Sequence, residues 1–403
     1  MSLTVGEAGI TGNGATTTVT IMHRVRTKAS TNPSRALSQA FEGVLKDSVP
    51  DQSLDPSLCF LNCLPCFSCA WSNITSDHWV LCTVQNGYLL QFSSLPPSLP
   101  TSPSLFRNPS HEHLLEKEVR LLLEAGAVEA VLRSLRGKGF YSRYFLIPKA
   151  KGGLRPILDL RGINKFLVKA RFRMVSLGTI IPSLDAGGWY AALDMKDVYF
   201  HIAIHPTHRR FLRFTVGQEH YQFAVLPFGL AAAPQVFTKY MAVLAAFLRR
   251  QRIQVYLYLD DWLLVGRSEA KMRGHVEAAL RLFRELGLLI KVPKSMLVPT
   301  QRVEFIGAVL DTVQARASLP ISRFQAIQQA VTSLRQSPMT MARCCLRLLG
   351  HMVACMHVVR HARLRLRTLQ AWLARVYHPG RDPLDLVVTA PRDVLDSLRW
   401  WQS

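Results

Sequence analysis

The stretch from Val255 to Val265 reads Val-Tyr-Leu-Tyr-Leu-Asp-Asp-Trp-Leu-Leu-Val and constrains the fold more than any other feature of the chain. Apolar and β-branched residues on both sides of Asp260 and Asp261 predict two short strands joined by a tight turn. An ordinary hairpin would carry Asn-Gly or Asp-Gly at its tip, whereas this tip carries two acids and no glycine. Two carboxylates held together repel each other, and a hard divalent cation such as Mg²⁺ or Mn²⁺ relieves that repulsion. Taken alone, such a pair is more often a solvated turn.

A second apolar run, from Trp189 to Asp194, also has a strand pattern and also ends on an acid. A two-metal site needs carboxylates from more than one strand, because each ion must touch an attacking or leaving oxygen as well as the protein. The sequence therefore predicts a divalent-metal site formed by Asp194, Asp260 and Asp261.

The composition is that of a large, folded and strongly basic protein. Its 403 residues are 49% hydrophobic, and 49 Lys and Arg residues against 27 Asp and Glu residues give a formal net charge of +22. A chain of this length can form two or more domains, and a folded protein this basic is expected to bind a polyanion, most commonly nucleic acid. An anionic membrane surface or a ribosome would also match the charge.

No uncharged apolar run is long enough to span a bilayer, and the N-terminus lacks the features of a secretory signal. We therefore predict an intracellular protein of the cytoplasm or nucleus, with no membrane partner. The eight cysteines suit a reducing compartment. Four of them cluster at Cys59, Cys63, Cys66 and Cys69, which leaves open a zinc site, with His78 as a further ligand, or simple apolar packing.

Before the two acid-bearing runs, the chain divides into three stretches. Residues 1–76 lack clear periodicity and predict a largely disordered leader. Residues 77–109 predict either two short strands around Gln85-Asn86-Gly87 or a docking segment, followed by a proline-rich linker. A helix is expected from Ser110 to a stop at Gly126, because leucines recur there at helical spacing.

Residues 142–161 predict two strands around a turn rich in Lys and Gly. Cations on a hairpin near a carboxylate metal site suit a nucleoside triphosphate, because its phosphates must be neutralised during transfer. The candidates are Lys149, Lys151 and Arg155, although a basic hairpin is more often a solvated loop.

The run Leu226-Pro227-Phe228-Gly229-Leu230 precedes a helix that begins near Pro234. Small residues at this turn allow another body to approach closely, and a base pair would fit there. A basic hairpin, a strand ending on an acid, this turn and Tyr258-Leu259-Asp260-Asp261 follow one another along the chain. In that order they resemble the fingers and palm of reverse transcriptases over about residues 140–310.

The resemblance implies an α+β fold with the right-hand polymerase architecture, in which fingers and a palm with an antiparallel sheet are followed by a helical thumb or connection. It places fingers and palm at residues 110–310, thumb and connection at 311–375, and a linker towards an RNase H domain at 376–403. Two apolar stripes are expected in the thumb, at Phe324, Ile327, Val331 and Leu334, and at Leu346, Leu348, Leu349, Met352 and Val353. Basic residues that would follow the phosphates of a duplex are Arg343, Arg347, Arg360, Arg363, Arg365 and Arg367.

The same resemblance implies roles for individual residues. Asp194, Asp260 and Asp261 would be the catalytic carboxylates that bind two Mg²⁺ ions, or Mn²⁺, and the carbonyl of Met195 would complete one shell. Tyr199 stands at the sugar-gate position, where a bulky ring disfavours the 2′-hydroxyl of a ribonucleotide. The other nucleotide-binding residues would be Lys149, Lys151, Arg155, Phe228, Gly229 and Lys294, the last as a proton donor to pyrophosphate. Template and primer would contact Pro227, Tyr258, Phe305 and Gly307.

Three stretches are similar to the polymerase of DIRS-type retrotransposons, which encode a tyrosine recombinase: residues 78–92, the run from Tyr258 to Leu263, and residues 384–401. In that family an RNase H domain follows the polymerase. Residues 359–403 do not contain the set of acidic residues that such a domain would need for catalysis. We therefore expect RNase H activity to be absent from this polypeptide.

The predicted function is RNA-directed DNA polymerisation by two-metal nucleotidyl transfer. Its partners would be an RNA template, a DNA primer, the RNA–DNA hybrid and dNTPs. An RNA-dependent RNA polymerase shares a palm with paired acids, but it normally avoids a bulky gate such as Tyr199. A catalytically inactive, nucleic-acid-binding remnant of a transposable element is the other alternative, and the intact acids argue against it.

Overall fold

The computed structural model describes residues 67–98, 109–148, 154–170 and 172–402 of this protein. Packing divides the chain after Ser318 into two compact units. Each unit has its own hydrophobic core. Among the helices within these ranges, none is both long enough and apolar enough to cross a bilayer.

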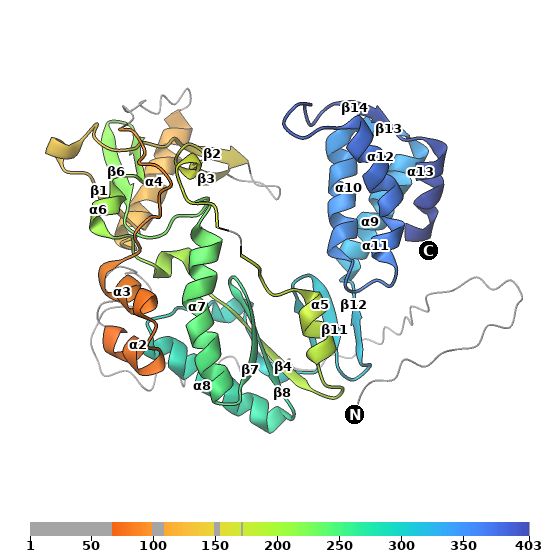
Figure 1. Ribbon diagram of the computed structural model, residues 1–403, viewed down its shortest axis with the longest axis horizontal. Helices are drawn as coiled ribbons and strands as arrows, with labels where there is room; N and C mark the ends of the chain where they lie inside the picture. Colours follow the sequence, from red (N-terminus) through yellow and green to blue (C-terminus); the bar gives the residue numbers. More distant parts are fainter. Residues whose placement is uncertain (1–66, 99–108, 149–153, 171, 403) are drawn as a thin grey trace, which may run out of the picture. The chain divides into compact units, whose positions relative to one another are not determined.

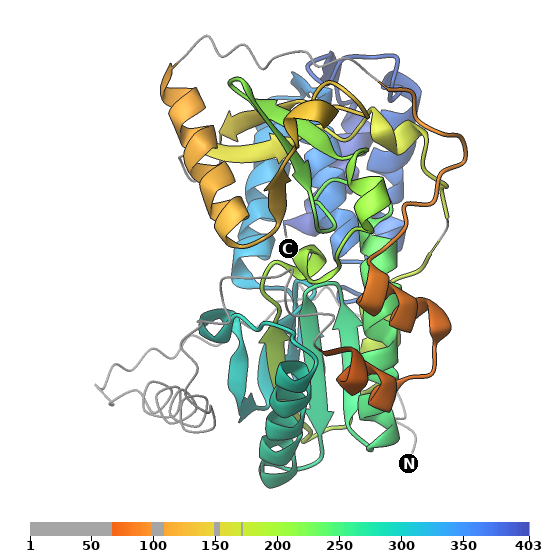
Figure 2. The ribbon, with the colours of Figure 1, turned by 90° about the vertical axis from the view of Figure 1, so that its left-hand side faces the viewer.

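Four strands of the larger unit form an antiparallel sheet, the central sheet, in the order β7-β8-β4-β9 (Figure 1). Its strands are β4 (Trp189–Asp194), β7 (Gln254–Tyr258), β8 (Asp261–Gly266) and β9 (Met296–Thr300). Helices α7 (Ala233–Arg250) and α8 (Glu269–Glu285) pack against this sheet on the same side (Figure 2). The strands predicted around the two acid-bearing runs and the helix predicted near Pro234 are therefore confirmed.

Further strands pack against helix α4 (Pro109–Glu124) in the same unit. They form an antiparallel sheet in the order β1-β6-β5 and a separate β2–β3 hairpin. Their bounds are β1 (Val128–Ala130), β2 (Tyr144–Pro148), β3 (Leu154–Leu158), β5 (Arg213–Val216) and β6 (Glu219–Phe223). The hairpin confirms the two strands predicted within residues 142–161. Helix α4 stops where predicted, because the chain turns at Gly126 with a φ of 67°.

Shorter elements complete the unit. Strands β10 (Arg302–Phe305), β11 (Ala308–Asp311) and β12 (Arg316–Ser318) form another antiparallel sheet. The connecting helical turns are η2 (Arg133–Leu135), η3 (Ile163–Lys165), α5 (Leu177–Ile180), η4 (Ile181–Ser183), η5 (Val198–His201), α6 (Pro206–Arg209) and η6 (Val292–Lys294).

The end of the predicted leader is an ordered helix, α2 (Ser68–Ile74). Trp71 is fully buried, its indole N–H donates to the carbonyl of Leu286 at 3.2 Å, and its ring centroid lies 4.5 Å from that of Tyr240. The prediction of disorder is therefore wrong for residues 67–76. Long-range burial of one tryptophan orders this segment, and its own sequence carries no periodic signal of that burial. Residues 1–66 lie outside the described ranges.

The strands predicted on both sides of Gln85 are also wrong, because helix α3 (His78–Asn86) occupies that stretch. The Asp77 side chain caps this helix by accepting a hydrogen bond from the backbone N–H of Val80. Gly87, with a φ of 86°, ends it. The Asn86-Gly87 pair therefore ends a helix and does not connect two strands.

The smaller unit is helical, as predicted for a thumb or connection. Its helices are α9 (Ile321–Gln336), α10 (Ala342–Ala354), α11 (Ala362–Arg365), α12 (Arg367–Val376), α13 (Arg392–Ser397) and η7 (Arg399–Trp401). Strand β13 (Met339–Met341) pairs with β14 (Val387–Thr389). Residues 376–403 were predicted to be a linker, but Val394, Leu398 and Trp401 are buried in the same core as α9 and α10. The boundary at residue 375 therefore has no counterpart in the packing.

The predicted helical stripes lie mostly on the buried faces of α9 and α10. Ile327, Val331 and Leu334 are buried on α9, and Leu348 and Met352 are buried on α10. Val353 was assigned to the second stripe but is exposed, because it lies on the outer face of its helix. The six arginines predicted to follow duplex phosphates are all exposed.

Candidate functional site

Strand pairing brings the three predicted acids to one end of the central sheet. Asp194, the last residue of β4, is the direct cross-strand partner of Asp261, the first residue of β8. Directly opposite residues of an antiparallel pair have Cβ atoms about 5 Å apart. Leu259 takes a φ of 52° in the turn between β7 and β8, and the Asp260 carbonyl accepts a 3.0 Å hydrogen bond from the Met195 N–H. The turn is thus fixed to the chain segment that follows Asp194.

The electrostatics of this cluster favour a bound cation. Burial, together with the charges of Asp260 and Asp194, raises the pKa of Asp261 to about 6. The Oδ1 atom of Asp194 is buried without a hydrogen-bond partner. The Nζ of Lys291 forms an ion pair with this oxygen at 3.7 Å, a separation too long for a hydrogen bond.

These residues fit a divalent metal, because a hard cation would satisfy the orphaned oxygen and remove the repulsion that raises the Asp261 pKa. Within the part of the chain that the structure describes, no three His, Cys, Asp or Glu side chains already converge as metal ligands do. The fit therefore rests on the orphaned oxygen and the raised pKa.

A cavity of about 300 Å³ adjoins the acids. Its lining includes Asp194, Asp261 and Lys294, together with Phe305 and Gly307 from the β10–β11 turn. The structure thus brings together residues that the sequence assigned to metal, nucleotide and primer, from four separate segments of the chain.

Tyr199 lies beside this cluster in η5, with 7% of its surface exposed. Burial and the charge of Asp260 raise the pKa of its hydroxyl. Its ring centroid lies 4.9 Å from that of Phe228 and 5.8 Å from that of Phe237. Phe228 is 51% exposed, so the two predicted nucleotide residues form one aromatic surface that is open on the Phe228 side.

The remaining predicted residues that the structure describes are not among those that line the cavity beside the acids. Arg155 is exposed on β3, opposite Ile147 in the hairpin, whereas Lys149 and Lys151 lie outside the described residues. Pro227 is buried, and Tyr258 pairs with Asp261 across the β7–β8 turn. Among the clustered cysteines, Cys69 is exposed on α2, and the other three fall outside the described ranges.

Sequence reasoning missed the residues that hold Asp194. The hydroxyl of Ser295 accepts a hydrogen bond from the Asp194 N–H and donates one to the Lys291 carbonyl, both at 3.0 Å. The Lys291 N–H in turn donates to the Asp194 carbonyl at 2.7 Å. These bonds join the segment before β9 to β4, and a lone serine gave no signal of them.

His201 was also missed, although it is buried at the end of η5. Its Nε2 accepts a 3.0 Å hydrogen bond from the Leu289 N–H, so Nδ1 carries the proton that faces the Val198 carbonyl at 3.2 Å. Burial lowers its pKa to about 4, which keeps the ring neutral at physiological pH. His201 thereby connects the Tyr199 segment to the segment that carries Lys291.

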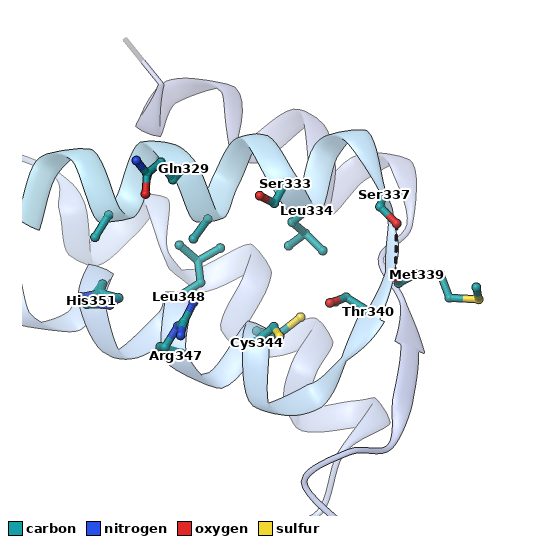
Figure 3. A pocket seen from close by; sticks show the side chains of 13 residues that line it. Gln329, Ser333, Leu334, Ser337, Met339, Thr340, Cys344, Arg347, Leu348 and His351 are labelled. Carbon is teal, nitrogen blue, oxygen red and sulfur yellow. Dashed lines mark hydrogen bonds between the residues drawn. The ribbon is translucent and has the colours of Figure 1, made fainter. Parts of the chain in front are cut away.

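A larger cavity of about 670 Å³ lies in the smaller unit, between α9 and the β13–α10 segment (Figure 3). Its lining mixes apolar and polar side chains, among them Gln329, Ser333, Arg347 and His351. The sequence had assigned Arg347 to duplex phosphates and gave no other residue of this lining a binding role.

The chain is similar to known proteins over about half of its length. Residues 147–310 match the family model described as reverse transcriptase (RNA-dependent DNA polymerase). The chain is 25% identical over 203 residues to the genome polyprotein of Petunia vein clearing virus, covering 50% of this chain and 9% of that protein. It is 27% identical over 232 residues to the retrovirus-related Pol polyprotein from transposon 412 of Drosophila melanogaster, covering 56% of this chain and 18% of that protein. It therefore spans less than a fifth of the length of these two relatives.

The fold has a counterpart among solved structures. The foamy viral protease–reverse transcriptase in complex with an RNA/DNA hybrid matches with a TM-score of 0.59 and 15% sequence identity. The match covers 94% of this chain and 47% of that one. The right-hand polymerase fold predicted from the sequence motifs is confirmed by this likeness.

Proposed function

We propose, from the match of residues 147–310 to the reverse transcriptase family, that this protein is an RNA-directed DNA polymerase of a retrotransposon. The observation that carries the proposal is the convergence of Asp194, Asp260 and Asp261 beside the cavity that also holds Lys294. The raised pKa of Asp261 and the buried Asp194 oxygen that lacks a hydrogen-bond partner suit a cation site.

Different residues of the chain would bind the metal ions and hold the metal ligands in place during nucleotidyl transfer. Asp194, Asp260, Asp261 and the Met195 carbonyl would hold two Mg²⁺ ions, or Mn²⁺, which supply charge neutralisation to the primer 3′-oxygen and the leaving pyrophosphate. Ser295 and Lys291 keep Asp194 in place through its backbone. Such transfers ask a protein mainly for positioning and electrostatics.

The incoming dNTP would lie between the acids and the fingers hairpin. Arg155, with Lys151 or Lys149, would neutralise its triphosphate, and Lys294 would protonate the departing pyrophosphate. Tyr199 would exclude a 2′-hydroxyl, and Phe228 and Gly229 would form the floor of the nucleotide site.

The nucleic-acid partners would be an RNA template, a DNA primer and their hybrid. Pro227, Tyr258, Phe305 and Gly307 would contact them near the acids. A formal net charge of +22 and the exposed arginines of the smaller unit suit recognition of a phosphate backbone. The foamy viral relative of this fold was solved with an RNA/DNA hybrid, and we extend that partner to this chain.

Two finer assignments belong to the proposal. The similarity of residues 78–92, the Tyr258–Leu263 run and residues 384–401 to DIRS-type polymerases supports an element of that subgroup. An intracellular site of action, in the cytoplasm or nucleus, is the second.

Primer extension tests the proposal. Purified full-length protein is given an RNA template with an annealed DNA primer, dNTPs and Mg²⁺, beside an Asp260→Asn, Asp261→Asn double variant. Extension by the wild type that is lost in the double variant and retained in Asp185→Asn, an exposed acid of the same unit, supports the proposal. Hybrid binding without extension would instead identify a catalytically inactive nucleic-acid-binding protein.

A further inference from the structure

Asn164 lies in the η3 turn after the fingers hairpin. Both the Nδ2 and the Oδ1 of its side-chain amide form hydrogen bonds with the backbone of the turn at residues 227–231. Its Nδ2 donates to the Gly229 carbonyl at 3.0 Å, and the Ala231 N–H donates to its Oδ1 at 2.8 Å. A backbone N–H can only donate, so the amide orientation is fixed by its partners. The backbone of Asn164 is itself held, because its N–H donates to the Leu160 carbonyl at 2.9 Å.

The turn that Asn164 grips has a conformation that needs support. Gly229 takes a φ of 92°, and the hydrogen bond within the turn, from the Leu230 N–H to the Pro227 carbonyl, is long at 3.4 Å. The side chains of Pro227 and Leu230 point into the core, whereas Phe228 is half exposed.

By holding the turn, Asn164 fixes the position of the Phe228 ring. That ring lies 4.9 Å from Tyr199 and 5.5 Å from Phe200, measured between centroids. Phe228 therefore limits the space into which the Tyr199 ring can rotate, and Tyr199 lies within the field of Asp260.

We propose that Asn164 is a positioning residue: it holds the 227–231 turn so that Phe228 braces Tyr199, and it thereby sets the preference for deoxynucleotides over ribonucleotides. This inference rests on the proposed polymerase function and adds a residue to which the sequence gave no role. Asn164 acts through the turn, because its two amide hydrogen bonds go to the turn backbone.

The test uses the full-length protein bound to an RNA–DNA hybrid whose primer ends in a dideoxynucleotide, so that binding is measured without chemistry. The affinities for the next dNTP and for the matching NTP are compared in wild type, Asn164→Ala and Asn164→Asp. Asn86→Ala, an exposed asparagine on α3, is the matched control. Hydrogen exchange at the Ala231 amide is followed in the same proteins.

We expect Asn164→Ala to lower the ratio of dNTP to NTP affinity about tenfold, because two hydrogen bonds to the turn are lost. Its Ala231 amide should exchange faster. Asn164→Asp retains the acceptor for Ala231 but opposes a carboxylate oxygen to the Gly229 carbonyl, so it should keep the Ala231 amide protected and still lose discrimination. A general loss of stability would not separate these two readouts.

Two results would overturn the inference while leaving the polymerase intact. One is unchanged discrimination in Asn164→Ala, and the other is unchanged exchange at Ala231 in that variant. A wild-type protein that forms no nucleotide-dependent complex on the hybrid would overturn the proposed function, and this inference with it.

Discussion

Replacing Asp261 by Asn should stabilise the protein at pH 8 in the absence of divalent cations. Burial and the neighbouring carboxylates raise the pKa of Asp261 from 3.8 to about 6, so the folded state holds its proton more tightly than the unfolded state. The stabilising contribution of this group is fully present below pH 3.8 and is lost as the pH rises through 6. At pH 8 the charged carboxylate therefore destabilises the fold, and a neutral amide does not.

The magnitude follows from the shift. A change of about two pKa units corresponds to about 3 kcal/mol for a group sealed from water. Asp261 is only half-buried, and solvent screening reduces the expected gain in unfolding free energy to about 1–2 kcal/mol. Added Mg²⁺ should stabilise the wild type more than the variant, because a cation that binds only the folded state raises its stability by mass action.

Urea denaturation with a chelator at pH 8 and at pH 4, and then with Mg²⁺ at pH 8, measures these differences. Asp185→Asn, an exposed acid of the same unit, is the control and should change little. The reasoning is refuted if Asp261→Asn is no more stable than wild type at pH 8 without metal. It is equally refuted if an advantage at pH 8 persists undiminished at pH 4, where both side chains would be neutral.

Four further perturbations test other parts of the structure. Trp71→Ala should lower the unfolding free energy by about 3–5 kcal/mol in urea denaturation, because a fully buried ring is lost; a change below about 1 kcal/mol would show that α2 is not part of the core. His201→Gln keeps an acceptor for the Leu289 N–H but cannot titrate. Because burial lowers the His201 pKa from 6.5 to about 4, wild type should lose up to about 3 kcal/mol as the pH falls from 6.5 to 4, and the variant should lose correspondingly less in the same denaturation series. Tyr199→Val should raise ribonucleotide incorporation at least about tenfold in primer extension, and unchanged selectivity would exclude Tyr199 as the gate. Arg347→Gln should weaken hybrid binding and reduce its salt dependence by about one counterion, whereas an equal salt slope would place this arginine outside the interface.

The central part of the fold was open to prediction because its signals are local. Strands around Asp194 and Asp260, the basic hairpin and the helix at Pro234 each carry their own periodicity and turn chemistry, and the structure has all of them. The α2 helix could not be predicted from local sequence, because Trp71 is held by Tyr240 and Leu286, which lie more than 160 residues away along the chain. The folded structure of residues 376–402 could not be predicted for a similar reason, since β14 is short and is stabilised by pairing with β13.

For the candidate site, the amino-acid sequence by itself determined which side chains are present and in which order: three acids at strand ends, a tyrosine after the first of them, and an exposed aromatic turn. Tertiary structure alone decided that Asp194 stands opposite Asp261 and that one oxygen of Asp194 is buried without a hydrogen-bond partner. It also decided that Ser295, His201 and Asn164 hold the site from outside. The physical reason is that carboxylate types can be recognised from spacing, whereas desolvation, mutual repulsion and single hydrogen bonds between distant segments exist only once the chain has folded.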